Sequence, residues 1–127
     1  MKWYKDDPIR FEMEKRLLAE NHGGSRIIIE NGTVRVEFTF ATCRDNYEMV
    51  AYFPKNYPYD PMQVFVKSPT LESPPHRYTN GRLCLHGDND FDAGTTAKVY
   101  IDWAKQWILT YEKWLATGEW PVGNKGN

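Results

Sequence analysis

Apolar and polar residues alternate through much of the first half of the chain, with the period of two that half-buried β-strands show. Two runs carry the pattern, residues 33–42 and 47–53, and two further runs, residues 26–30 and 62–67, are predicted strands rich in residues that favour β-structure. Only Asn31-Gly32 separates residues 26–30 from residues 33–42, and this dipeptide is typical of a tight hairpin turn. The pattern predicts a four-stranded antiparallel meander with one face in the core and one polar face.

A period close to four replaces the alternation near the N-terminus. It predicts a helix from Asp6 or Asp7 to about Asn21, with Pro8 at the first helical position. The expected core-facing stripe consists of Ile9, Met13 and Leu17, with Leu18 beside them. We expect a glycine in a left-handed cap at Gly23-Gly24 to end the helix, and His22 to be solvated near its C-terminus.

A second helical pattern closes the chain, from about residue 101 to Thr117, with Gly118 as the expected C-cap. Its apolar residues fall at helical spacing: Ala104, Trp107, Ile108, Tyr111 and Leu115. An aromatic face of this width is more typical of a core than of a binding groove. Residues 123–127 are expected to be frayed.

Between the meander and the second helix lie three segments without helical or strand periodicity. Residues 53–61 contain three prolines, which exclude regular structure. Past an Asn-Gly turn, Cys84 stands between two leucines, so we expect its thiol to be anchored by apolar packing and still reachable. Residues 87–96 form an acidic loop that lacks the ligand spacing of a calcium site.

Composition narrows the class of protein. The 127 residues suit one domain, residues 1–127, with a core over about 6–117. A net charge of −1 without a basic stripe argues against nucleic acid or an anionic membrane as a partner. No apolar run approaches the ~20 residues of a membrane span, and the N-terminus lacks a secretion signal, so we expect a soluble cytoplasmic protein.

The two cysteines indicate neither a disulfide nor a metal centre. A disulfide between Cys43 and Cys84 is not expected in a reducing cytoplasm. Cys84 and His86 form one Cys-x-His pair without the further close ligands that zinc needs, so no metal or cofactor is expected. Cys43 is expected to be a small buried thiol at the end of a strand.

Two local motifs then suggest a family. Residues 52–61 read YFPKNYPYDP and residues 80–85 read NGRLCL. In this order they resemble the F-P-x-x-Y-P-F-x-P-P and N-G-x-I-C-L signatures of ubiquitin-conjugating enzymes, with Met62 in place of the last proline. The resemblance covers residues 6 to about 117. It implies an α+β, ubiquitin-conjugating-enzyme-like fold: an N-terminal helix, a four-stranded antiparallel meander, an active-site loop and a C-terminal helix.

Within that family, the first residues of the chain and the tryptophan-rich segment 103–120 resemble the short stand-alone prokaryotic members of bacterial cyclic-oligonucleotide antiphage (CBASS) operons. The resemblance implies that Cys84 accepts a C-terminal carboxyl as a thioester and yields it to an amine, a hydroxyl or water. The carried protein would be the operon's cGAS-like nucleotidyltransferase, through its C-terminal tail, or a ubiquitin-like protein. Whether a separate activating enzyme takes part is left open.

One position departs from the family pattern. Family members usually carry an asparagine eight residues before the cysteine, where this chain has His76. A histidine N–H can donate the hydrogen bond attributed to the asparagine, so His76 is a candidate substitute. The alternatives are that His76 only fixes the loop through a backbone carbonyl, or that the role is unfilled.

Neighbouring residues are further candidates for the chemistry. His86 is a candidate general base, and Arg82 and His86 together are candidates for positive potential at the thiol. Acids at 88–92, or Asp102, are candidates to assist an attacking amine. Two rival interpretations remain: a catalytically silent binding module of the same fold that recognises a ubiquitin-like or nucleotidyltransferase tail, and a cysteine hydrolase.

Overall fold

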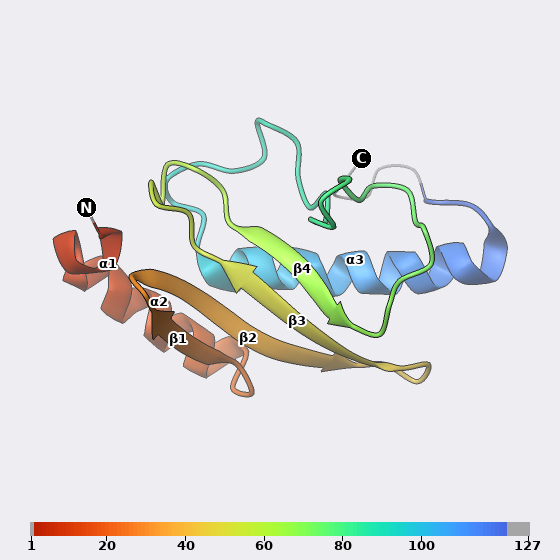
Figure 1. Cartoon of the computed structure of the whole chain (residues 1–127), viewed down its shortest axis with the longest axis horizontal. Helices are drawn as coiled ribbons and strands as arrows, with labels where there is room; N and C mark the ends of the chain where they lie inside the picture. Colours follow the sequence, from red (N-terminus) through yellow and green to blue (C-terminus); the bar gives the residue numbers. More distant parts are fainter. Residues whose placement is uncertain (1, 122–127) are drawn as a thin grey trace.

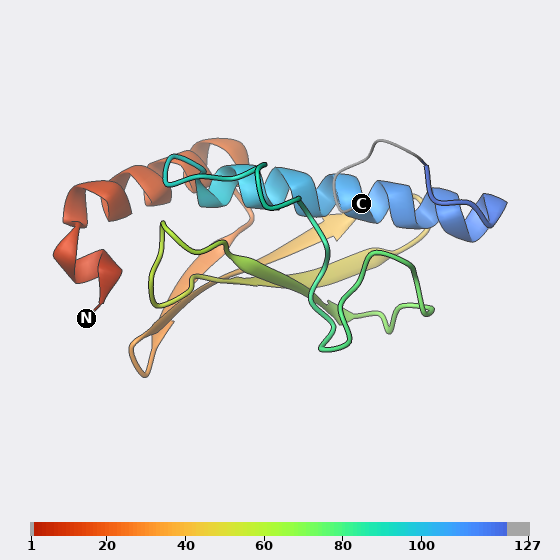
Figure 2. The same ribbon diagram turned by 90° about the horizontal axis from the view of Figure 1, so that it is seen from above.

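The computed structural model describes residues 2–121 of the chain. Its elements in chain order are α1 (Trp3–Asp6), α2 (Pro8–Asn21), β1 (Arg26–Glu30), β2 (Thr33–Ala41), β3 (Asn46–Tyr52), β4 (Gln63–Ser68) and α3 (Ala97–Thr117). The strands form one antiparallel sheet in the order β1-β2-β3-β4, and α2 and α3 lie on the same side of it (Figures 1 and 2). The predicted α+β meander is therefore confirmed. The expected fraying of residues 123–127 lies outside the described residues.

The hairpin between β1 and β2 has the predicted geometry. Asn31 has a φ of 53° and Gly32 a φ of 77°, the two left-handed residues of a type I′ turn. Glu30 and Thr33 pair directly across that turn, which sets the register of the sheet. The apolar side of β2 and β3 faces the core, as the alternation predicts. The buried members are Val34, Val36, Phe38, Tyr47, Met49 and Ala51.

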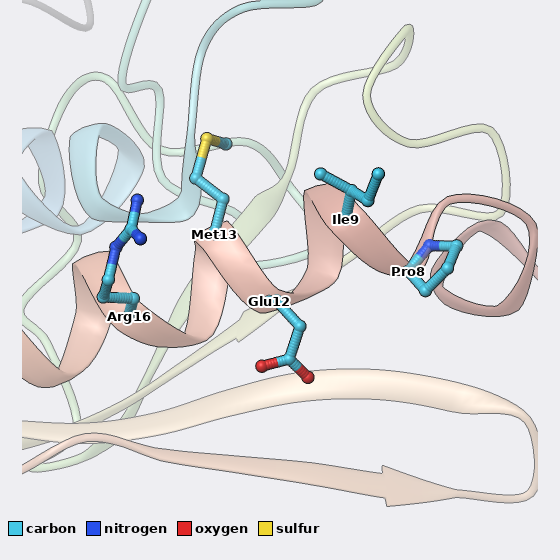
Figure 3. Close-up of a pocket in the computed structure, with 5 residues that line it drawn as sticks. All are labelled: Pro8, Ile9, Glu12, Met13 and Arg16. Atoms are coloured by element: carbon cyan, nitrogen blue, oxygen red, sulfur yellow. The ribbon is translucent and has the colours of Figure 1, made fainter.

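Helix α2 has nearly the predicted bounds, and Leu18 is buried as predicted, but Ile9 of the same predicted stripe is 83% exposed. Figure 3 shows Ile9 and Met13 projecting from the same side of α2, where they line a surface cavity of about 470 Å³. Glu14, which lies outside the predicted stripe, is buried instead, because several polar partners compensate its charge.

The partners of Glu14 come from three separate segments. Its carboxylate accepts hydrogen bonds from Arg10 Nε at 2.9 Å, from the Tyr57 hydroxyl, and from the backbone N–H of Ala97 at 2.9 Å. Arg10 also donates to the carbonyl oxygens of Ala93 and Thr95. This buried network connects α2 to the proline-rich loop and to the acidic loop, and so holds in place the segment that leads to α3.

The same network explains where α3 begins. The helix starts at Ala97, four residues before the predicted start near residue 101. The Thr96 side chain makes no capping hydrogen bond, and the Glu14 carboxylate satisfies the first N–H group instead. The other end agrees with the prediction, because Gly118 has a φ of 78° and its N–H donates to the Trp114 carbonyl at 2.7 Å.

His22 is buried, so the prediction of a solvated side chain was wrong. It is 8% exposed and lies between α2 and α3. Its Nε2–H donates to Asp102 Oδ1 at 2.9 Å, and its Nδ1 accepts from Lys105 Nζ at 2.9 Å, which defines a neutral imidazole. His22 is also the C-cap of α2, with a φ of −139°, so the expected left-handed glycine cap does not occur there.

The prediction for Cys43 was also wrong. Strand β2 ends at Ala41, and Cys43 lies exposed in the turn that leads to β3. Thr42 ends the strand's pairing by accepting hydrogen bonds from the Arg44 and Asp45 N–H groups. The chain therefore turns away from the core before it reaches the thiol. None of the helices within residues 2–121 combines the length and apolar character that a membrane crossing requires.

Candidate functional site

The flanking leucines hold Cys84 at the edge of the sheet. Leu83 and Leu85 are each 3% exposed, whereas Cys84 is partly exposed. The Leu83 N–H donates to the carbonyl of Val64 in β4 at 2.9 Å, so the backbone before the thiol is attached to a strand. The thiol is thus anchored and accessible, as the apolar-cysteine-apolar pattern predicts.

A tight turn before Cys84 brings two side chains together. Gly81 adopts a φ of 91°, and its N–H donates to the Tyr78 carbonyl at 2.9 Å. The Tyr78 N–H donates in turn to the Arg82 carbonyl at 2.8 Å. The Arg82 guanidinium carbon consequently lies 4.0 Å from the centre of the Tyr78 ring, a cation–π contact.

His76 holds Cys84 through its backbone and not through its ring. Its carbonyl accepts both the Cys84 N–H at 2.9 Å and the indole N–H of Trp107 at 3.1 Å. The residue has a φ of 61°, an uncommon conformation for a side-chain-bearing residue. Its ring packs against Trp120 with the ring centres 5.1 Å apart and forms no hydrogen bond within residues 2–121. The geometry therefore favours a positioning role.

His86 lies in an aromatic enclosure. Its ring centre is 4.9 Å from that of Phe91, 5.7 Å from Trp103 and 5.9 Å from Tyr100. Because Nδ1 lies 3.1 Å from the Gly87 carbonyl, Nδ1 carries the proton, and Nε2 of the neutral ring is left as the basic nitrogen. Within the described chain, no hydrogen bond joins His86 to the thiol.

The electrostatics of Cys84 differ from the expectation of an activated thiolate. Burial raises the pKa of the Cys84 thiol, and hydrogen bonding by Tyr78 and the positive charge of Arg82 offset that rise only in part. Arg82 therefore contributes positive potential at the thiol, Tyr78 contributes a hydrogen bond, and His86 is not among the groups that shift this pKa. The raised pKa favours the protonated thiol over the thiolate.

A cavity of about 210 Å³ is lined by Leu83 and Leu85, the two neighbours of this cysteine. Its lining combines apolar side chains, among them Met62 and Phe91, with four polar ones: Tyr78, Arg82, His86 and Asp88. Such a mixture of an apolar wall and a few convergent polar groups is typical of a site that orients an incoming group. Tyr78 and Arg82 both line the cavity and both act on the thiol.

The acidic candidates separate in space. Asp88 lines the cavity. Asp90 accepts the Gly87 N–H and Asp92 accepts the Gly94 N–H, so these two carboxylates shape the loop itself. Asp102 pairs with His22 and, at 2.7 Å, with Lys98. Among the described residues no cluster of three or more acidic, histidine or cysteine side chains is arranged to hold a metal ion.

Tyr78 is the site residue that the sequence reasoning missed. The signal was present, because Tyr78 and Arg82 flank an Asn-Gly turn, and a turn of that kind brings the residues on its two sides together.

Comparisons with known proteins place these features in context. The model of the family described as "Type II CBASS E2 protein" matches residues 14–127. Among solved structures, the chain is similar to a ubiquitin conjugating enzyme E2 from Plasmodium falciparum. The two share 22% identity over 78% of this chain and 80% of that chain, with a TM-score of 0.57. The likeness shows a ubiquitin-conjugating-enzyme fold. No curated protein sequence matches significantly.

Proposed function

Since the chain belongs to the Type II CBASS E2 protein family, we propose that it is an acyl carrier that forms a thioester on Cys84 with the C-terminus of a partner protein. Membership gives the chain a ubiquitin-conjugating-like role in an antiphage system. The observation that carries the finer proposal is the setting of Cys84. It is a partly exposed thiol, held by Leu83, Leu85 and the His76 carbonyl, and Tyr78 and Arg82, which act on it, also line a cavity of mixed apolar and polar character.

The proposed reaction has two acyl transfers. In the first, the Cys84 thiolate attacks an activated C-terminal carbonyl, the activating group leaves, and the thioester forms. In the second, an amine attacks the thioester carbonyl, the C–S bond breaks, and an amide and the Cys84 thiolate result. The amine loses one proton and the thiolate gains one, which the raised pKa of Cys84 favours.

Two histidines have different proposed roles in this scheme. His86 offers Nε2 as the acceptor of the proton that the attacking amine loses, because Nδ1–H is occupied by the Gly87 carbonyl. His76 positions Cys84 through its carbonyl, which binds the N–H of the cysteine directly.

The carried protein is proposed to be the operon's cGAS-like nucleotidyltransferase, through its C-terminal tail, with a ubiquitin-like protein as the other candidate. The chain would act in the bacterial cytoplasm as one domain, residues 1–127. A protein substrate agrees with the family, whose members act on protein partners.

Intact-mass spectrometry of the chain, co-expressed with its neighbouring operon genes, tests the proposal. Wild type should carry an adduct that dithiothreitol removes, because a thiol cleaves a thioester. Cys84→Ser should carry an ester adduct and Cys84→Lys an amide adduct, both resistant to dithiothreitol. Cys43→Ser is the matched control and should load like wild type, since Cys43 lies in the turn after β2.

The same experiment distinguishes the silent binding module. If neither wild type nor either Cys84 variant carries an adduct, and Cys84→Ala still co-purifies with the partner, then the fold serves recognition alone.

A further inference from the structure

The Arg82 guanidinium lies in the site without a polar partner. Its Nε–H is buried and donates to no acceptor within residues 2–121, and none of its nitrogens forms an ion pair there. Two other arginines show what a fully engaged side chain looks like. Arg10 binds Glu14 and two carbonyls, and Arg35 binds Glu30 and Glu37. An unsatisfied buried donor is rare in native proteins and calls for an explanation.

The position of this guanidinium is nevertheless well determined. Its centre stacks on the Tyr78 ring at 4.0 Å. Both residues belong to the turn closed by the Tyr78 N–H to Arg82 carbonyl bond, and the Arg82 N–H donates to Asn80 Oδ1 at 3.0 Å. A planar fork of N–H groups is therefore held beside the thiol, although nothing in the described chain accepts those N–H groups.

The groups near the Arg82 guanidinium do not accept its N–H donors within the described residues. Asp88 lines the same cavity but forms no ion pair with Arg82 among the described residues. The positive charge of Arg82 acts on the Cys84 thiol, two residues further along the chain. An acceptor brought in on Cys84 would thus be the group that meets these N–H donors.

We propose that Arg82 is a catalytic residue of the transfer, donating hydrogen bonds to the carbonyl oxygen of the acyl group carried on Cys84. The proposal rests on the proposed thioester function and assigns it a donor. The imidazole of His76, the candidate for that task from sequence, packs against Trp120 instead. The Tyr78 ring packs against the guanidinium and so acts as a positioning residue.

The step balances without any further reactant. The amine nitrogen bonds to the thioester carbon, and the carbonyl π pair moves onto oxygen, where the Arg82 N–H groups stabilise the negative charge. The pair then returns, the C–S bond breaks, and Cys84 leaves as thiolate. The proton of the amine passes to a base, and the thiolate takes up a proton from water. Removing one such donor typically slows this chemistry by about 10²–10³-fold.

A chemically loaded acyl enzyme tests the assignment without the natural partner. A fluorescein-labelled peptide α-thioester that ends in glycine is exchanged onto Cys84 of the full chain carrying Cys43→Ser, so that the exposed Cys43 thiol takes up no label. The labelled protein is then mixed with free lysine at pH 8, and the loss of label is followed as a single-turnover rate constant. Loading, melting temperature and the pH profile of Cys84 alkylation are measured in parallel.

The main variant is Arg82→Lys, which keeps the charge but removes the planar fork. We expect its discharge rate constant to fall by about 10²–10³-fold, with loading, melting temperature and the alkylation profile unchanged. Arg77→Lys is the matched control. Arg77 lies in the same loop and pairs with Leu83 only as a backbone bridge, so its variant should discharge like wild type.

Each outcome is decisive. If Arg82→Lys discharges within threefold of wild type, the assignment of Arg82 is overturned while the thioester function stands. If wild type itself accepts no peptide on Cys84, both the thioester function and this assignment are overturned. Should Arg82→Lys not fold, Tyr78→Leu removes the platform under the guanidinium. That variant should discharge about tenfold more slowly, and an unchanged rate overturns the assignment.

Discussion

The buried carboxylate of Glu14 offers the sharpest stability test in this fold. Its side chain is fully inaccessible, and it accepts from Arg10, Tyr57 and the Ala97 N–H. Glu14→Gln keeps the volume, so no cavity opens, but it removes the charge that compensates Arg10. Arg10, whose side chain is 14% exposed, then keeps its carbonyl partners but loses its counter-charge, and removing one partner of a buried ion pair typically costs about 3–5 kcal/mol.

That cost is a large part of the stability of a domain of this size, which is about 5–15 kcal/mol in total. Urea unfolding followed by tryptophan fluorescence measures it as a lower midpoint with an unchanged slope. The melting temperature should fall by more than about 10 °C. The control is Glu12→Gln on the same helix, whose carboxylate makes only a surface pair with Lys15 at 2.6 Å and should change stability by less than about 0.5 kcal/mol.

A double substitution separates the charge from the architecture. Replacing the pair together, as Arg10→Met with Glu14→Leu, removes both buried charges and should cost clearly less than the sum of the single changes. A loss below about 1 kcal/mol for Glu14→Gln, no greater than that of Glu12→Gln, would refute the reasoning that this network connects α2 to α3.

Three further outcomes follow from other contacts. Burial and the Lys105 charge lower the pKa of His22, so the unfolded chain binds this proton more readily. The contribution of His22 to stability is therefore fully present above about pH 6.5 and is lost as the pH falls. His22→Gln should flatten the plot of melting temperature against pH between about pH 7 and 5. Because burial raises the pKa of Cys84, iodoacetamide should alkylate the exposed Cys43 first at pH 7.5 in a peptide-resolved mass assay; equal rates would contradict the burial argument. Gly118→Ala should cost about 1 kcal/mol in urea unfolding, because the left-handed φ of 78° strains a side-chain-bearing residue although the space around it is open; an unchanged midpoint would argue against a left-handed cap.

Short-range pattern alone determined much of this fold. Alternation located β2 and β3, and Asn31-Gly32 set the hairpin between β1 and β2 because its two residues tolerate left-handed φ. Gly118 ended α3 for the same local reason. The leucines on both sides of Cys84 indicated an anchored thiol, since apolar flanks pack wherever the segment meets a core.

The candidate site was only partly readable in this way. Cys84, His76 and His86 were named from the motif, but motif spacing carries no information on where a ring points. The His76 ring lies against Trp120 because the loop before the cysteine and the segment after α3 meet there. Tyr78 and Arg82 stack because the turn between them closes, and that contact depends on side-chain placement as well as on the turn.

Charge compensation was decided by the tertiary structure alone. Glu14 is buried beside the predicted apolar stripe of α2 because partners from residues far along the chain compensate its charge. Periodicity reflects the cost of burying a charge but not the groups that offset it. His22 is buried for the same reason, since Asp102 and Lys105 on α3 satisfy both of its ring nitrogens. The sequence by itself therefore determined the local elements and the cysteine, whereas the fold decided which polar groups are buried and which remain available to a substrate.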